Sequence, residues 1–158
     1  MGRLFDAVGA LTGVRAEVTF EGQAAIELEA ACDPDERGTY PVSLMQTGDQ
    51  LLIDPRPMVR AVADDASAGA APSAIATRFH RAIADVTVNA CARLADTHGT
   101  EVVALSGGVF QNRRLLESVS AGLGARGLQV LVPEQLPVND GGVAYGQAVI
   151  ASSLLAAA

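Results

Sequence analysis

Residues 101–112 read EVVALSGGVFQN, and this stretch is the strongest indication of the fold. The apolar run from Val102 to Leu105 is short and unbroken, as in a strand that is buried on both faces. An amphipathic helix that ends near Gly127 is predicted after it, and the apolar run at 128–132 predicts a second buried strand. Strand, helix and strand within so short a segment indicate a right-handed crossover between two parallel strands.

Two adjacent glycines, Gly107 and Gly108, come at the carboxyl end of the first strand, where ligands of open α/β sheets bind. Because glycine has no Cβ, a planar base or a ribose can lie against its backbone, next to the free N–H groups of the following helix. Asn112 adds an amide at this rim. The alternative is that the glycines only make a tight turn. The segment matches neither a Walker loop nor the dinucleotide-binding fingerprint.

A second glycine turn, PVNDGG at 137–142, follows the second strand and precedes a final helix. Its carboxylate, Asp140, has two possible roles. Asp is a frequent helix N-cap, and it is also a hard oxygen ligand for Mg²⁺, Mn²⁺ or Fe²⁺. The sequence pattern alone favours the role of helix cap. If a phosphate-bearing ligand binds at the neighbouring glycine turn, the role of metal ligand is favoured instead.

The remainder of the chain is predicted to be mainly helical. The expected elements are a helix at 3–12, an extended piece at 16–20, a helix at 24–31, a hairpin made by 40–45 and 51–53, a helix opened by Pro55 and Pro57, a loop at 64–72, and a long amphipathic helix from an N-cap at Ser73 to His98. One lobe is expected, with a helical section at 1–38 and an α/β section at 39–158.

Composition excludes several classes of function. A net charge of -7 with 4% aromatic residues leaves no basic stripe or stacking platform for nucleic acid. No apolar run is long enough to span a membrane and no signal peptide is apparent, so we expect a cytoplasmic protein without a membrane partner. Cys32 and Cys91 lack metal-ligand spacing, and His80 and His98 favour structural roles. No covalent nucleophile is indicated, so no catalytic residue is assigned.

Five segments together resemble the HypF family, the carbamoyltransferases that mature [NiFe] hydrogenases. They are MGRLFDAVGALTG, FEGQAAIELEA, IATRFHRAIAD, VVALSGGVFQNRRLLE and PVNDGGVAYGQA. The resemblance implies an α/β fold, namely the C-terminal lobe of a TsaD-like domain of the actin, sugar kinase and heat-shock ATPase (ASKHA) superfamily. Such a lobe has a short, partly parallel sheet with flanking helices.

The resemblance also implies a nucleotide site for ATP or carbamoyl adenylate. Gly107 and Gly108 would contact the adenosine, and Asn112 would bond to the nucleotide. Around the ribose the resemblance places Asp6, Gly22 and Glu27. Asp140 matches the family's metal-binding aspartate, for a divalent ion that could be Mg, Mn, Fe or Zn.

In the full enzyme, the resemblance implies ATP-dependent activation of carbamoyl phosphate and transfer of the carbamoyl group to the C-terminal cysteine of HypE. The family's HxxxH histidines, YrdC-like domain and other lobe are not found in this sequence, so we expect the chain alone to be inactive and to need that lobe as a partner. Three alternatives stay open: the lobe of an antibiotic-type O-carbamoyltransferase, a noncatalytic fragment or interaction module, and self-association as a homodimer through exposed apolar faces.

Overall fold

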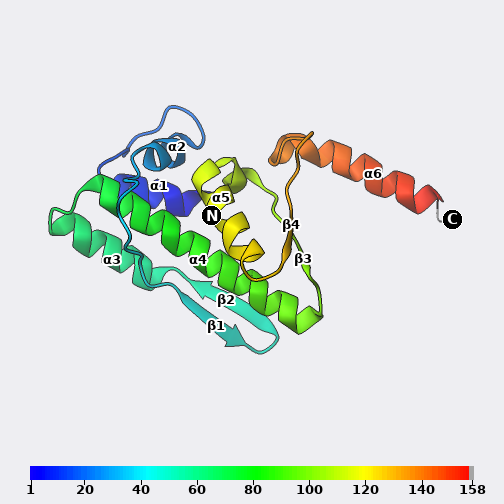
Figure 1. The fold of residues 1–158 in the computed structure, drawn as a ribbon. Coiled ribbons are helices and arrows are strands. Elements are labelled where there is room, and N and C mark those ends of the chain that lie inside the picture. Colours follow the sequence, from blue (N-terminus) through cyan, green and yellow to red (C-terminus); the bar gives the residue numbers. More distant parts are fainter. Residues whose placement is uncertain (157–158) are drawn as a thin grey trace.

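The computed structural model describes residues 1–156 and shows a helical body with two short sheets (Figure 1). The elements, in chain order, are α1 (Gly2–Leu11), α2 (Gln23–Ala30), β1 (Ser43–Thr47), β2 (Gln50–Asp54), α3 (Arg56–Ser67), α4 (Pro72–His98), β3 (Val102–Ala104), the 3-10 turn η1 (Gly108–Gln111), α5 (Arg113–Gly124), β4 (Gln129–Leu131), the 3-10 turn η2 (Asp140–Gly142) and α6 (Val143–Ala156). The α/β class and the flanking helices predicted from the sequence are confirmed.

Helix α4 is the centre of the body, and α1, α2, α3 and α5 pack around it. Its buried face includes Ile75, Phe79 and Ile83, which share one core with side chains from the other four helices. Gly99 ends the helix with a left-handed cap whose N–H donates to the Ala95 carbonyl. The predicted N-cap at Ser73 is wrong, because Pro72 already occupies the first turn, where its missing N–H costs no hydrogen bond.

The predicted parallel unit is present as β3, α5 and β4. Val103 pairs with Val130, and the ladder continues where the Leu105 N–H donates to the Leu131 carbonyl at 2.9 Å. The prediction that these strands are buried on both faces is wrong. Val102 and Leu131 are 42% and 48% exposed, since within residues 1–156 the helices cover only the face that carries Val103 and Val130. The apolar runs are therefore covered on one side only.

The hairpin is confirmed as β1 and β2, which pair antiparallel around Gly48 and Asp49 and form a sheet separate from that of β3 and β4.

Two local predictions are wrong. Residues 64–67 continue α3 instead of starting a loop, because Asp65 is held there by Tyr40 and Arg78. Residues 16–20 form bends rather than an extended piece, since the Thr19 N–H donates to the side chain of Gln23.

Helix α6 projects away from the body (Figure 1). All of its residues are exposed, including the apolar side chains of Val149, Ile150, Leu154 and Leu155. An apolar surface on every side of a helix is typical of a helix that is buried all round. Among the described residues, none of the helices is long and apolar enough to cross a membrane.

Candidate functional site

The two glycine turns predicted from the sequence meet in space. Each follows the carboxyl end of a parallel strand, β3 or β4, so both lie at one edge of the small sheet. The Gly107 N–H donates to the Val138 carbonyl at 2.7 Å. A Cβ placed on Gly108 would lie 3.8 Å from the Cβ of Asn139. The edge therefore combines both turns in a single surface.

The backbone conformation requires glycine at position 107 but not at position 108. Gly107 has φ 101° and ψ 156°, a conformation that side-chain-bearing residues rarely adopt. Gly108 has no positive φ and is exposed, and a Cβ there would make only ordinary contacts with Asn139 and Gln111. The backbone needs glycine at 107, whereas at 108 the lack of a side chain leaves an open, flat surface.

The second turn is tightly constrained. A Cβ on Gly142 would lie 2.6 Å from the Pro137 carbonyl oxygen, so only glycine fits this close approach. Asn139 caps η2, since its Oδ1 accepts the Gly141 N–H at 3.1 Å. The cap that the sequence offered as one role for Asp140 thus belongs to the residue before it. Asp140 itself is exposed at the start of η2.

Asn112 is the N-cap of α5 and is only 8% exposed. Its Oδ1 accepts the Leu115 N–H at 2.8 Å, which satisfies one of the free donors of the first turn. Its Nδ2 lies 2.9 Å from His80 Nε2. Asn112 is therefore fixed from two sides, and it links the glycine turn to the core of the body.

His80 lies in the core, as its predicted structural role requires, with 2% exposure and edge-on contacts to Phe5 and Phe79. Its Nδ1 is 2.8 Å from the Ala76 carbonyl, which can only accept, so Nδ1 carries the hydrogen and Nε2 accepts from Asn112. Burial lowers the pKa of His80 and favours this neutral form. Sequence reasoning missed the pairing with Asn112, because 32 residues separate the two.

Cys32 adds a thiol to this buried group. Its Sγ lies 3.4 Å from His80 Nδ1 and 3.5 Å from the Leu28 carbonyl. Burial raises the pKa of the Cys32 thiol, which keeps it protonated and able to donate to Leu28. Both cysteines are half-buried and free.

The three residues expected around a ribose lie on two packed helices, α1 and α2. Asp6 is exposed on α1, and Gly22 is the N-cap directly before α2, in a left-handed conformation with φ 82°. Glu27 accepts two hydrogen bonds of 2.7 Å from Arg15 and one of 2.9 Å from Gln23, and these lower its pKa. Within residues 1–156, no hydrogen bond joins these three to the glycine turns.

Helix α2 is nevertheless tied to the start of α5, two residues beyond Asn112. The Arg114 N–H donates to Glu29 Oε1 at 2.9 Å. Gly9 lets α1 approach α2 closely, since a Cβ there would lie 3.2 Å from that of Ala24. Sequence reasoning missed both Arg15 and Glu29, and no local pattern distinguishes them from solvated charges on a helix face.

The described residues contain no group of three His, Cys, Asp or Glu side chains that could hold a metal. Asp140 supplies a single exposed carboxylate beside the glycine edge. Mg²⁺ commonly binds one or two carboxylates together with phosphate oxygens and water. The site thus fits an ion that arrives with a phosphate-bearing ligand, and it does not fit a metal held by this chain's side chains alone.

The chain resembles known carbamoyltransferases along nearly its whole length. Residues 1–147 match the family model of the carbamoyltransferase Kae1-like domain, second subdomain. The chain is 42% identical to carbamoyltransferase HypF of Synechocystis sp. over 93% of its own length and 18% of that protein. It is 43% identical to a HypF homolog of Cupriavidus necator, covering 96% of the chain and 40% of the homolog.

Solved structures agree. A full-length HypF crystallised in a phosphate- and nucleotide-bound form superposes with a TM-score of 0.92 at 41% identity, covering 98% of this chain and 20% of that one. The chain thus spans about a fifth of the length of the full HypF proteins that it matches. On sequence and on structure, the chain belongs to the HypF carbamoyltransferase family.

Proposed function

We propose that this chain forms the adenosine-binding part of a HypF-type carbamoyltransferase, which holds ATP or carbamoyl adenylate. The observation that carries the proposal is the meeting of the two glycine turns, joined by the hydrogen bond from Gly107 to Val138. This places bare backbone and one carboxylate at the sheet edge where ligands of such folds bind. The related full-length HypF was solved with nucleotide bound, which supports the assignment.

Each predicted residue has a specific role in this proposal. The adenosine lies against Gly107 and Gly108, and the exposed backbone at 108 gives it a flat surface without a Cβ. Asn112 uses one Nδ2 hydrogen for His80 and offers the second to the nucleotide. Asp140 positions a divalent ion at the phosphates, which supplies charge neutralisation.

Asp6, Gly22 and Glu27 contact the ribose in this proposal. Arg15 and Gln23 hold the Glu27 carboxylate in one orientation, so it is ordered before a ligand arrives. The bond between Glu29 and the Arg114 N–H keeps α2 next to the first turn of α5. The chain's contribution to catalysis is then to orient the nucleotide rather than to supply a nucleophile.

We further propose that the enzyme transfers the carbamoyl group to the C-terminal cysteine of HypE during [NiFe] hydrogenase maturation, in the cytoplasm. This acceptor comes from the family resemblance. The exposed apolar surface of α6 and the open face of β3 and β4 support a role as part of a larger assembly, in which other segments of the enzyme cover them.

Calorimetric titration of ATP with Mg²⁺ into the purified chain tests the adenosine site, with GTP as the competing nucleotide. Gly108→Ala is the informative variant, because the backbone there tolerates a Cβ while the added methyl fills the flat surface. We expect ATP binding to weaken roughly fivefold or more, as overfilled contacts cost about 1 to 3 kcal/mol.

Gly124→Ala is the matched control, since this exposed glycine at the end of α5 has no positive φ and no atom within 4 Å of an added Cβ. It should bind ATP like the parent chain. A folded chain that shows no adenine-selective binding, or equal affinities for both variants and the parent, would contradict the proposal.

A further inference from the structure

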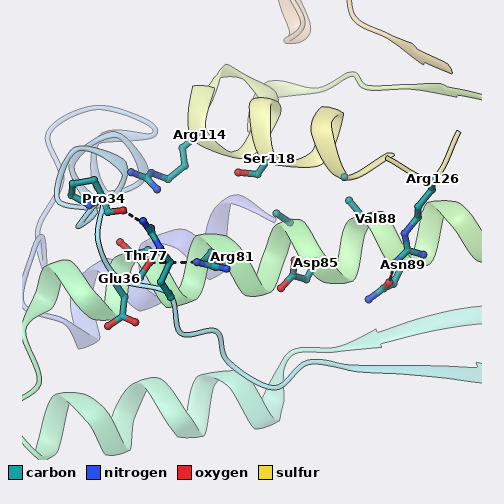
Figure 2. Close-up of a pocket in the computed structure, with 13 residues that line it drawn as sticks. Pro34, Glu36, Thr77, Arg81, Asp85, Val88, Asn89, Arg114, Ser118 and Arg126 are labelled. Atoms are coloured by element: carbon teal, nitrogen blue, oxygen red, sulfur yellow. Dashed lines mark hydrogen bonds between the residues drawn. The ribbon is translucent and has the colours of Figure 1, made fainter. Parts of the chain in front are cut away.

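A groove on the described part of the molecule lies away from the glycine turns, between α4 and α5, with residues 34–37 alongside (Figure 2). Its volume is about 560 Å³, which is in the range of small-molecule sites. Four of its lining residues are arginines, although the chain has a net charge of -7. They are Arg37, Arg81, Arg114 and Arg126, referred to below as the arginine groove.

None of these four guanidinium groups forms a salt bridge within residues 1–156, whereas Arg15, Arg56, Arg78 and Arg113 each do. The groove arginines make weaker contacts with neutral oxygens. Arg37 donates to the Pro34 carbonyl at 2.6 Å, Arg81 to the Glu36 carbonyl at 3.4 Å, and Arg126 to Asn89 Oδ1. Their charges are therefore not neutralised by the described chain.

The two carboxylates in the groove offset only part of this charge, since Glu36 is already paired and Asp85 carries a single negative charge. Glu36 already accepts from Arg78 at 2.8 Å, outside the set of four. Asp85 is exposed and accepts only a long bond of 3.5 Å from Thr39. Positive charge thus remains in excess along the groove.

The shape of the groove narrows the choice of ligand. Its floor contains small side chains, and a Cβ on Gly122 would lie 2.7 Å from Val88, so glycine is needed for the close approach of the helices. No aromatic side chain lines it, so it offers no stacking surface for a base. Guanidinium forks match the oxygens of phosphate in a bidentate manner.

We propose that the arginine groove binds a small, multiply charged anion of the phosphate class, at a site distinct from the adenosine site. Arg81 on α4 and Arg114 in the first turn of α5 line one end of the groove, while Arg126 lies at the other end, two residues beyond α5 (Figure 2). A diphosphate presents oxygens on both sides and can engage guanidinium groups of both helices. The inference goes beyond the proposed nucleotide function and rests on guanidinium groups that the nucleotide proposal does not use.

Inorganic pyrophosphate is the probe, titrated calorimetrically into the chain at constant ionic strength. The double variant Arg81→Gln with Arg114→Gln, one from each helix at the same end of the groove, should weaken binding about tenfold or more, because it removes charge-assisted hydrogen bonds to the phosphate oxygens. The matched control, Arg3→Gln with Arg60→Gln, removes the same charge from two exposed residues outside the groove and should bind like the parent.

Two further measurements make the result independent of folding and of the adenosine site. In the parent chain, pyrophosphate should shift the Nε–H resonances of Arg81 and Arg114 and leave those of Arg3 and Arg60 unchanged. Gly108→Ala should keep its affinity for pyrophosphate even where ATP binding is lost. If ADP competes with pyrophosphate at the same resonances, the natural ligand is the phosphate chain of a nucleotide. If ADP does not compete, the natural ligand is a free phosphate compound. Both outcomes support the site.

The proposal is overturned if a folded parent chain shows no saturable binding of pyrophosphate. Equal losses of affinity in the groove pair and in the control pair would also overturn it, since that result indicates a nonspecific charge effect.

Discussion

The helical body around α4 and the edge formed by β3, β4, the glycine turns and α6 are built in opposite ways. In the body, apolar side chains are buried and a polar residue such as His80 has a partner for each ring nitrogen. At the edge, apolar side chains such as Leu155, 81% exposed, face outward and backbone is left bare. The comparison teaches that stability resides in the body, whereas the surface proposed to bind nucleotide lies at the edge.

The largest expected contrast is between Phe79 and Leu155. Phe79→Ala removes a fully buried ring whose centroid is 4.8 Å from that of Phe5, and it should lower the free energy of unfolding by about 3 to 5 kcal/mol. Leu155→Ala, at the exposed end of α6, should leave it unchanged. Urea unfolding followed by circular dichroism measures both. Similar losses for the two variants would show that α6 is part of the folded core.

A second contrast compares two asparagine caps. Asn112→Ala removes the cap of α5 and leaves His80 Nε2 without its donor, so a loss of about 2 to 3 kcal/mol is expected. Asn139→Ala removes only the partly exposed cap of η2, with a loss of about 1 kcal/mol or less. Equal effects in urea unfolding would mean that the contact with His80 adds nothing to stability.

The pH dependence of stability sharpens the same comparison. Burial lowers the pKa of His80 in the folded chain below its unfolded value of about 6.5, so the unfolded chain binds more protons as the pH falls. The stability contributed by neutral His80 is complete above about pH 6.5 and is lost as the pH falls toward the folded pKa. Urea midpoints at neutral and mildly acidic pH should therefore differ.

The loss on acidification should become smaller in His80→Gln and persist in His98→Gln, which changes an exposed residue at the end of α4. A loss that is unchanged in His80→Gln would assign the pH effect to other groups.

The smallest expected effects come from charge pairs. Asp65 accepts from Tyr40 at 2.6 Å and from Arg78 at 2.8 Å in a half-buried network, so Asp65→Asn should cost about 1 kcal/mol of unfolding free energy. Arg113→Gln breaks an exposed pair with Glu117 one helical turn away and should have no measurable effect on the thermal midpoint. A larger loss from Arg113→Gln than from Asp65→Asn would show that an exposed charge pair stabilises the chain more than the half-buried network does.

Much of the fold could be predicted because its signals are local. The stripe that includes Ile75, Phe79 and Ile83 predicts α4, and the Gly48 turn between two extended runs predicts the hairpin. The predictions that failed depended on distant contacts. Residues 64–67 remain helical because of Tyr40 and Arg78, and residues 16–20 bend because of a side-chain bond to Gln23.

The same division applies to the candidate site. The glycine pair and Asp140 could be selected from the sequence because they follow predicted strand ends, where ligands of open α/β sheets bind, and because they fall in recognisable motifs. Their meeting through Gly107 and Val138, and the second role of Asn112 as partner of His80, could not be selected in this way. For residues far apart in the chain, the local sequence does not indicate which residues will be in contact after folding.

By itself, the sequence determined the family, the element types and the two glycine turns, since these depend on local periodicity, backbone freedom and recognisable motifs. Only the tertiary structure decided that one face of the β3–β4 sheet stays open, that Glu27 is bound to Arg15, and that four unneutralised arginines share one groove. The physical reason is that exposure and charge pairing depend on the sum of contacts from every neighbouring element, and that sum exists only once the chain has folded.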